Sequence, residues 1–221
     1  MFEVSGVYYE KNGNTLTVCG PCENWDKDEL ILTDEINGIP ITEIRAYAFQ
    51  NVSGLKKVYI PRLVNKIGTK AFNNCLDLET VVCYREKDSQ SIKLGYQAFQ
   101  NCENLKHIKG GARLELVGDF VFYGCKSLEN MPTCICGKIR AGTFMNCPNM
   151  RSLFMNYVTE VDDTAIDGNH GVQNMFVLKD FKYSKKFIEL VRNVKIICPR
   201  ESSFSDLIYD GFNIVTNIPV K

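Results

Sequence analysis

The sequence predicts a repeat solenoid built mainly from β strands and short helical turns, with about six repeats of 22–27 residues and a cap at each end. One aromatic position recurs along the chain, with gaps of 23, 27, 23, 22 and 22 residues between successive copies. It is occupied by Phe49, Phe72, Phe99, Phe122, Phe144 and finally Ile166. Self-similarity at such a period means that one structural unit is stacked on copies of itself.

Other positions repeat in phase with the aromatic one. Apolar residues recur five positions before it and six and nine positions after it, so each repeat offers several side chains to a common interior. The positions five before it hold Ile44, Ile67, Leu94, Val117, Ile139 and Val161. We expect the aromatic rings to stack from one repeat to the next, because no single repeat could bury them alone.

Each repeat contains one strand, in the segment six to eleven positions after the aromatic residue. Inward apolar positions alternate there with outward positions at period two, as in Lys57-Val58-Tyr59-Ile60, which is typical of a half-buried strand. Pro61 follows directly and ends this strand, because proline cannot donate a hydrogen bond to a neighbouring strand.

The aromatic residue itself lies in a short motif, Ala-Phe-x-Asn-Cys in its fullest form. The motif is too short for a full helix and too apolar for a free loop, so it predicts one helical turn or a tight bend. Two residues after the aromatic position comes Asn or Gly, which suits a positive φ angle. These residues are Asn51, Asn74, Asn101, Gly124, Asn146 and Gly168.

Two segments depart from the repeat. The polar run at residues 85–91 lengthens one gap, and we expect it to bulge from the solenoid as a loop. Residues 184–192 begin with a capping serine and carry Phe187, Ile188 and Val191 on one helical face. They predict a helix that covers the open end, where uncovered strand edges would recruit other chains.

The stretch from Ile67 to Val81, Ile-Gly-Thr-Lys-Ala-Phe-Asn-Asn-Cys-Leu-Asp-Leu-Glu-Thr-Val, resembles the BspA-type leucine-rich repeat. In that family Ile, Ala-Phe, Cys and Leu recur at about 23 residues. Members often open with a strand hairpin that caps the first repeat and close with a strand ending in proline and a short helix. Leu30 to Ile44 and residues 196–212 are similar to these two caps, so the resemblance covers nearly the whole chain.

We therefore expect a single leucine-rich repeat domain over residues 1–221. It divides into an N-terminal capping hairpin at 1–40, repeats at 41–178 and a C-terminal strand and helix cap at 179–221. The sixth repeat has Ile166 for Phe and Asn169 for Cys, which agrees with the rule that terminal repeats are atypical.

Charge and hydropathy exclude two classes of partner. The 26 basic and 26 acidic residues give a formal net charge of zero, and no block of Lys and Arg stands out, so we expect no nucleic-acid partner. No apolar run approaches about 18 residues, so we expect no membrane insertion. The N-terminal residues lack the basic-then-apolar pattern of a secretory signal, whereas the resemblance implies a family with many exported and surface-displayed members. The location stays open.

The ten cysteines divide by position. Cys75, Cys102, Cys125 and Cys147 share one repeat position and predict a ladder of small buried thiols. Cys83 and Cys198 fall on inward strand positions and are also expected in the core. The paired spacing of structural zinc ligands is absent, so we expect no metal and no cofactor.

Cys19-Gly-Pro-Cys22 spells the thioredoxin active-site tetrapeptide and supports an alternative function, a thiol-disulfide redox protein. That chemistry needs a thiolate whose pKa is lowered at a helix N-terminus, within a βαβ unit. Residues 14–18 predict a strand, but residues 23–29 show no apolar helical period. We therefore rank the redox interpretation second.

Other catalytic patterns are missing. The chain has no phosphate-binding loop, no His-Glu-x-x-His and no Gly-x-Ser-x-Gly. The only histidines are His107, on an outward strand position, and His170, in the loop of the degenerate repeat. We expect both to be solvated polar residues and the protein not to be an enzyme.

What remains is the outward face of the repeated strands, where two positions form two columns. The first column reads Lys57, Thr80, His107, Asn130, Ser152 and Asn174. The second reads Tyr59, Val82, Lys109, Pro132, Phe154 and Phe176, with Ile197 as a further member. The second column is unusually apolar for an outward face, which favours an interaction surface. The alternative is that these side chains pack under a flanking loop or simply favour strands.

The sequence thus predicts a non-enzymatic protein-interaction or adhesion module that presents a rigid strand face to a protein or peptide partner. A mixture of hydroxyl, amide and aromatic groups suits such a partner better than a small molecule, which needs a deep pocket. The candidate partner-binding residues are Tyr59, Val82, Lys109, Phe154, Phe176, Lys57 and His107.

Overall fold

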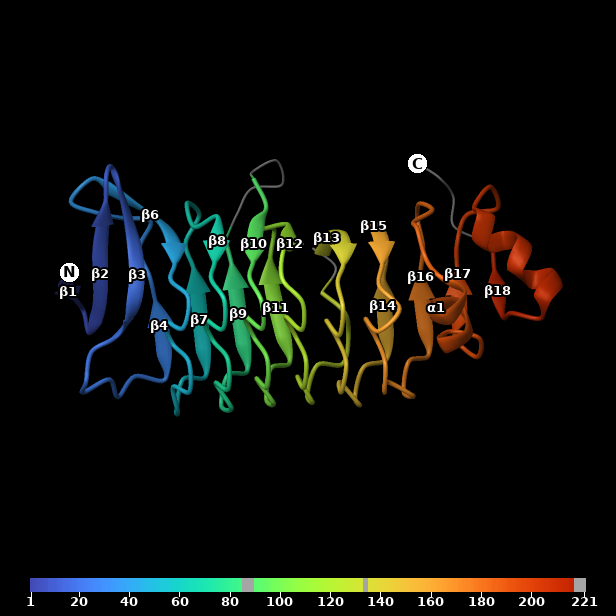
Figure 1. The fold of residues 1–221 in the computed structure, drawn as a ribbon, viewed down its shortest axis with the longest axis horizontal. Coiled ribbons are helices and arrows are strands. Elements are labelled where there is room, and N and C mark those ends of the chain that lie inside the picture. The colour runs from blue at the N-terminus through green and yellow to red at the C-terminus, as the bar shows by residue number, and fades with distance from the viewer. Residues whose placement is uncertain (85–89, 133–134, 217–221) are drawn as a thin grey trace.

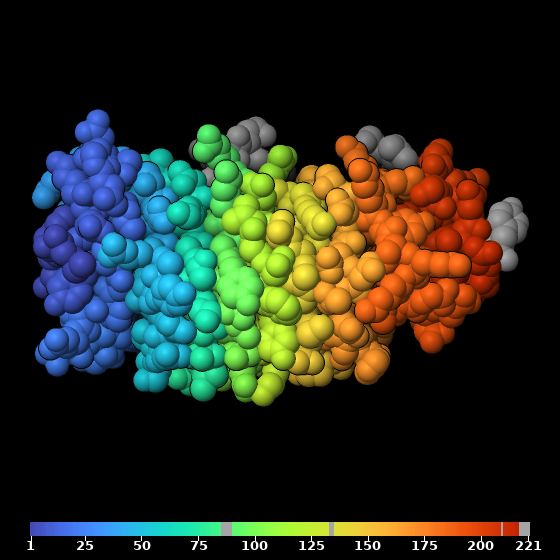
Figure 2. Space-filling view, viewed as in Figure 1, coloured from blue at the N-terminus to red at the C-terminus, as the bar shows by residue number. Residues whose placement is uncertain are grey.

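The computed structural model of the chain describes residues 1–84, 90–132 and 135–216. They form an elongated solenoid whose coils follow one another along one axis, with the N-terminal strands at one end and the last helical segment at the other (Figure 1). In a space-filling view the coils appear as successive bands along this axis (Figure 2). The expected repeat solenoid is confirmed. The loop expected at residues 85–91 falls largely on residues 85–89, which lie outside the described part.

One long sheet runs along most of the solenoid. It begins with an antiparallel hairpin and continues as parallel strands, one from each successive coil. A two-residue strand, β5 (Glu35–Ile36), pairs with β6 at its side. The order along the long sheet is β1 (Phe2–Val4), β2 (Val7–Asn12), β3 (Thr15–Pro21), β6 (Ile39–Ile44), β8 (Lys66–Ile67), β10 (Ile92–Leu94), β12 (Leu114–Leu116), β13 (Ile135–Ile139) and β15 (Tyr157–Val161).

Two parallel short sheets contain the repeated strands that the sequence predicts. The N-terminal short sheet is β4 (Glu29–Ile31), β7 (Lys57–Ile60), β9 (Thr80–Cys83) and β11 (His107–Gly110). The C-terminal short sheet is β14 (Ser152–Phe154), β16 (Asn174–Phe176), β17 (Lys195–Ile197) and β18 (Ile214–Val215). The core lies between the long sheet and the short sheets.

The repeated phenylalanines form a continuous stack at the centre of this core. The ring centroids are 5.3 Å apart for Phe49–Phe72 and for Phe72–Phe99, and 5.6 Å apart for Phe99–Phe122 and for Phe122–Phe144. All five rings are buried. Stacked rings contribute more than their buried area alone, so the aromatic position ties each coil to its neighbours.

The motif around each phenylalanine forms turns rather than a helix, as the sequence predicts. Backbone N–H groups alternate between a bond inside the turn and a bond to the next coil. Gln50 N donates to Tyr47 O at 3.2 Å, whereas Phe49 N donates to Ala71 O at 2.7 Å. The Asn or Gly two residues later has a positive φ in all six repeats, from 56° at Asn101 to 78° at Gly168.

The cysteine ladder is confirmed and has a definite role. Each thiol donates a hydrogen bond to the carbonyl of the phenylalanine in the preceding coil, at 3.0 Å from Cys75 to Phe49 and 3.1 Å from Cys102 to Phe72. Cys125 and Cys147 repeat the contact at 3.3 and 3.2 Å. Asn169, which replaces the cysteine in the last repeat, donates its amide to the next carbonyl of the series.

One of the expected core positions is wrong. Val117 is 44% exposed, and Leu116 takes the buried place, because Leu116 and not Val117 is in register with Leu94. The N–H groups of Val117 and Gly118 both donate to the Leu94 carbonyl, at 3.0 and 3.1 Å. The chain therefore bulges by one residue at this coil.

The C-terminal helix lies one coil before the end. Helix α1 (Lys185–Leu190) is capped by Ser184, whose hydroxyl accepts a bond from Phe187 N at 3.1 Å, as expected. It replaces the aromatic turn of its coil, and β17 returns from it to the C-terminal short sheet. The expectation that this helix covers the open end is corrected, because β18 and η1 (Ser203–Asp210) lie beyond it (Figure 1).

Candidate interaction surface

The strand registers align the predicted outward residues in columns, as expected, but these columns fall into two separate groups. In the N-terminal short sheet, Lys57, Thr80 and His107 are in register, and so are Tyr59, Val82 and Lys109. In the C-terminal short sheet, Phe154, Phe176, Ile197 and Val215 are in register. The structure therefore brings together the members within each sheet and separates the two sets.

The N-terminal group is built around Tyr59. Its ring stacks on that of Tyr84, with centroids 6.2 Å apart and an interplanar angle of 9°. The Lys57 ammonium lies 4.7 Å from the centroid of the Tyr59 ring. Hydrogen bonding to the Tyr59 side chain, together with nearby charges, raises the pKa of Lys57 above its ordinary value. Lys57 is therefore positively charged beside an aromatic face.

Val82 is wrong as an exposed candidate. It occupies an outward position but is only 8% exposed. Its register partner is Tyr59, and Tyr84 follows two residues later on the same face of the strand. The stacked tyrosine rings thus flank Val82 and shield it. The usable apolar surface of this group is the tyrosine pair rather than the valine.

The C-terminal group is a second aromatic stack. The rings of Phe154 and Phe176 lie 4.9 Å apart at an interplanar angle of 7°, and both are half-buried. Ile197 and Val215 extend the column toward the end of the solenoid, and each is also half-buried. Four apolar side chains in adjacent strands therefore present a continuous, ordered strip to solvent.

The gap between the two groups begins at Pro132. Within the described residues, the coil between β11 and β14 contributes a single bridge, from Asn130 to Ser152, and does not pair with β11. Pro132 occupies the column position held by Lys109 and Phe154 in the adjacent coils. Proline has no N–H to donate, so the ladder of hydrogen bonds cannot continue through it.

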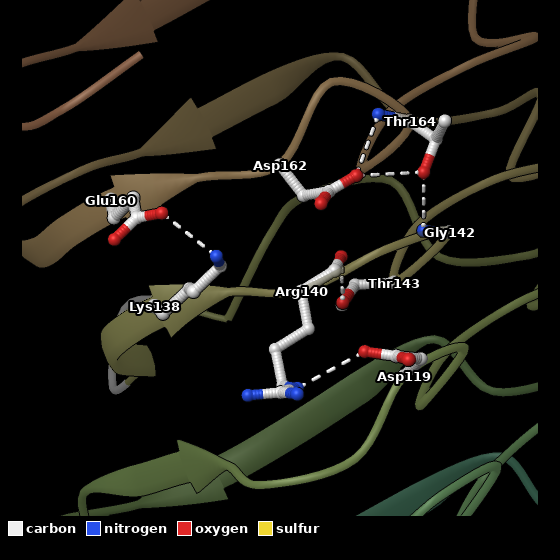
Figure 3. Close-up of polar contacts among 8 residues, drawn as sticks. All are labelled: Asp119, Lys138, Arg140, Gly142, Thr143, Glu160, Asp162 and Thr164. Atoms are coloured by element: carbon white, nitrogen blue, oxygen red, sulfur yellow. Dashed lines mark hydrogen bonds and ion pairs between the residues drawn. The ribbon is translucent and has the colours of Figure 1, made fainter.

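The outward face of the long sheet is different in character, because several of its charges are paired. Glu43 binds Lys66 at 2.8 Å, and Lys138 binds Glu160 at 2.7 Å. Figure 3 shows the second of these pairs beside the contact between Arg140 and Asp119, at 3.0 Å.

The same cluster continues into neutral groups. Asp162 accepts bonds from the backbone N–H and the hydroxyl of Thr164, whose hydroxyl oxygen accepts a bond from Gly142 N at 3.1 Å (Figure 3). The charged groups drawn in Figure 3 are thus satisfied by each other or by turn residues. Exposed pairs of this kind contribute about 0–1 kcal/mol each to the free energy of folding. The part of this face that these pairs occupy is therefore polar and solvated.

The Cys19-Gly-Pro-Cys22 motif lies in the N-terminal hairpin. Cys19 belongs to β3, and Cys22 follows the end of that strand, so the motif does not lead into a helix. Burial raises the pKa of Cys19 above its ordinary value, although Arg45 opposes the shift. A redox thiolate needs the opposite shift and a helix N-terminus. The strand setting expected from the sequence is present, whereas the helix is not.

Other candidate sites add little. Among the described residues, no group of three or more His, Cys, Asp or Glu side chains is placed to hold a metal ion. In the same residues, no helix is long and apolar enough to cross a membrane. His107 and His170 are both exposed, as expected.

The sequence matches the BspA type leucine rich repeat region over residues 34–151 and 86–194, with six copies. The chain belongs to the BspA-type leucine-rich repeat family. No curated protein matches it in sequence.

Solved structures of bacterial leucine-rich repeat proteins share its fold. A leucine-rich repeat protein of T. pallidum superimposes with a TM-score of 0.60 at 21% identity, over 91% of this chain and 83% of the other. A leucine-rich cell surface protein of Faecalibacterium prausnitzii A2-165 gives 0.54 at 18% identity, over 90% of this chain and 50% of the other. The chain spans about half the length of that second protein.

Sequence reasoning missed two members of the surface. Ile31 is in register with Tyr59 and is 68% exposed, and Tyr84 is 55% exposed. Ile31 precedes the first recognised repeat, so the periodic pattern does not reach it. Tyr84 lies one position past the outward and inward alternation that defines the strand. Ile31 could have been found by extending the column to one earlier strand, and Tyr84 by extending the strand pattern by one residue.

Proposed function

We propose that the protein is a non-enzymatic interaction module that binds a protein or peptide partner through the outward face of its two short sheets. The observation that carries this proposal is the contrast between two faces of one molecule. The long sheet presents ion pairs such as Glu43–Lys66 and Lys138–Glu160, whereas the short sheets present two stacked pairs of aromatic rings, with the Lys57–Glu29 ion pair beside the first of them. Aromatic residues are enriched and charged residues are depleted at the centres of protein interfaces.

The rigidity of the fold supports the same proposal. Phe154 and Phe176 are fixed by their strand register and by their mutual stacking, so little freedom is lost when a partner covers them. The shape of the surface also favours a macromolecule, because the rings form a strip along the sheet rather than the wall of a deep cavity.

The proposed adhesion role is a matter of where this surface is displayed. The structural neighbour from F. prausnitzii is described as a cell surface protein. Display on a surface would direct the same aromatic strip toward a partner on another cell or in the surrounding matrix. This role needs no residues beyond those of the interaction module.

The proposal is tested by site-specific photocrosslinking in cells that naturally make the protein. A photoreactive phenylalanine replaces Phe154 or Phe176 in the full chain, and a third variant carries it at Lys66 on the long sheet as a matched control. We expect one and the same protein to be crosslinked from both positions on the short sheet and not from position 66.

The crosslinked protein is then purified and its affinity measured directly. Tyr59→Ala and Phe176→Ala should each weaken binding by about tenfold or more, since truncation of a buried aromatic anchor costs about 2 kcal/mol. Lys66→Ala should leave the affinity unchanged. Equal crosslinking from both faces, or an affinity indifferent to the two aromatic variants, would show that the short sheets are not the binding surface.

A further inference from the structure

The break between the two short sheets leaves a depression of about 330 Å³ in the middle of the proposed binding face. It lies between β11 on one side and the segment leading to β14 on the other. Its lining combines cationic, apolar and aromatic side chains, and includes His107, Ile108, Lys109, Met131, Pro132 and Phe154.

The floor of this depression reaches the core of the solenoid. Ile108 occupies the inward strand position that is fully buried in the other coils, and it is instead half-buried. Its equivalents are Val58, Val81, Met131, Leu153 and Met175, each at most 1% exposed. An apolar side chain of a partner could therefore contact core surface here without any rearrangement of the sheet.

The edge of β11 also lacks the backbone partners that β7 and β9 have on both sides. In neighbouring coils the first strand residue donates to the preceding coil, as His107 N does to Glu79 O at 3.2 Å and Asn174 N does to Arg151 O at 3.1 Å. In the described residues, no N–H from the next coil reaches the Lys106 carbonyl, and Pro132 has none to offer Ile108. Open strand edges of this kind pair with extended peptides.

The charge beside the opening is positive. Within the described part of the chain Lys109 forms no ion pair, and its neighbours in the column, Val82 and Pro132, carry no charge. His107 is exposed on the same strand. An ammonium group at the rim of an apolar depression favours a carboxylate that follows or precedes an apolar side chain.

We propose that this cleft binds an extended peptide segment of the partner in which an apolar side chain lies next to an acidic one. The inference rests on the proposed function and names the part of the partner that is recognised. The apolar side chain packs on Ile108 and Phe154, the carboxylate pairs with Lys109, and the peptide backbone meets the unpaired edge of β11.

The test uses the full chain, labelled for NMR, and a defined set of short peptides. The probes are N-acetylated, C-amidated hexapeptides of the form Ser-Thr-X-Z-Thr-Ser, in which X is Val, Leu, Ile or Phe and Z is Asp or Glu. We expect at least one to shift the Ile108 methyl signals and the backbone amides of β11 at peptide concentrations up to about 1 mM. The matching peptides with Asn or Gln at Z should bind about tenfold more weakly.

Two protein variants and one control sharpen the result. Lys109→Gln should weaken binding by about tenfold and abolish the preference for Asp or Glu at Z, whereas Lys93→Gln on the long sheet should change neither. Pro132→Val restores a backbone donor, with the residue found at the equivalent position as Val82. It should slow amide exchange along β11 and remove peptide binding.

The outcomes separate this inference from the proposed function. If no peptide perturbs β11 in the folded protein, the inference is overturned, and crosslinking from Phe154 and Phe176 still decides the proposed function. If peptides bind but perturb only the aromatic columns and ignore Lys109→Gln and Pro132→Val, the face binds peptides and the cleft is not the site. Loss of crosslinking from both aromatic positions would overturn the function itself.

Discussion

A single side chain in each aromatic repeat gives the buried phenylalanine carbonyl of the preceding coil an added hydrogen-bond donor. The Phe72 carbonyl accepts one bond within its own turn, from Cys75 N at 3.2 Å. The Cys102 thiol of the next coil donates a second bond to the same oxygen, and Asn169 donates the equivalent bond to Phe144 O where the cysteine is lost. The repeated cysteines are therefore explained by hydrogen bonding between adjacent coils and by close packing.

The first prediction follows from this contact. Cys102→Ala removes the second donor to the buried Phe72 carbonyl, which keeps its bond from Cys75 N, so we expect a loss of about 0.5–1.5 kcal/mol in the free energy of unfolding, measured by urea denaturation. Cys136→Ala is the control, because Cys136 is only half-buried and its contact with Leu114 O is longer, at 3.5 Å. A variant at position 102 as stable as the control would contradict the role assigned to the ladder.

The same thiols predict a dependence of stability on alkaline pH. Burial raises the pKa of Cys75 and of Cys147 from 9.0 to about 12. Between these values the folded protein retains protons that the unfolded chain has lost, so rising pH favours unfolding. The stability contributed by each neutral thiol is complete below about pH 9 and falls by about 1.4 kcal/mol per pH unit above it.

This dependence is measured by denaturation at a series of pH values from neutral to strongly alkaline. Cys75→Ala should reduce the slope above pH 9. Burial also raises the pKa of Tyr9 to about 12, so the comparison is best made in a Tyr9→Phe background. A slope that is unchanged by Cys75→Ala would show that the thiol titrates alike in the folded and unfolded chains.

Among the elements of structure, the aromatic stack links one coil to the next. Phe99 stacks on Phe72 and on Phe122, at 5.3 and 5.6 Å. We expect Phe99→Ala to cost about 3–5 kcal/mol, because it leaves a cavity in a fully packed core. Phe2→Ala, at a ring that is 40% exposed, should cost far less when both are measured by denaturation. Equal losses would mean that the stack adds nothing beyond ordinary surface contacts.

The elements also show which parts of the fold can be predicted from the sequence. The turn and the positive φ at the Asn or Gly position recur in every copy, and the strand recurs in all but the coil of Pro132, so the period exposes them without any structure. The bulge that exposes Val117 does not, since one inserted residue leaves the surrounding pattern of Leu and Gly intact. A second column of positive φ, at Tyr47, Lys70, Gln97, Phe120 and Gly142, is also hidden, because only its last member is a glycine.

The candidate site is a harder case than the fold. The column residues follow from period-two alternation, which predicts direction but not exposure. Val82 is outward and yet covered, because neighbouring tyrosines lie over it. The break in the sheet has a signal, Pro132 at a position that needs a donor, but its result depends on how the flanking strands separate. Side-chain cover and strand separation are properties of the packed molecule rather than of the repeat.

At the scale of the whole molecule, the strands of each described coil pair with those of the adjacent coils along the axis, so stability is largely local and spreads by contact between adjacent repeats. The C-terminal end depends on one aromatic cluster. Phe204 of η1 is fully buried, 5.0 Å from the ring centroid of Phe181 and 4.8 Å from that of Tyr183. The packing of Phe204 against these two rings holds η1 against the final coils.

We therefore expect Phe204→Ala to loosen the C-terminal coils without disturbing the first repeats. In hydrogen exchange, the amides of α1, β17 and β18 should exchange at least about tenfold faster in the variant, since a cavity of this kind costs more than 1.4 kcal/mol locally. The amides of β7 and β9 should keep their rates, because the changes remain near the altered end in an array whose strands pair with those of adjacent coils. Leu190→Ala, at a side chain that is 39% exposed on α1, serves as the control and should alter neither region. Uniform acceleration along the whole chain would instead mean that the solenoid unfolds as one cooperative unit, in which case the aromatic stack couples the coils more tightly than their nearest-neighbour contacts suggest.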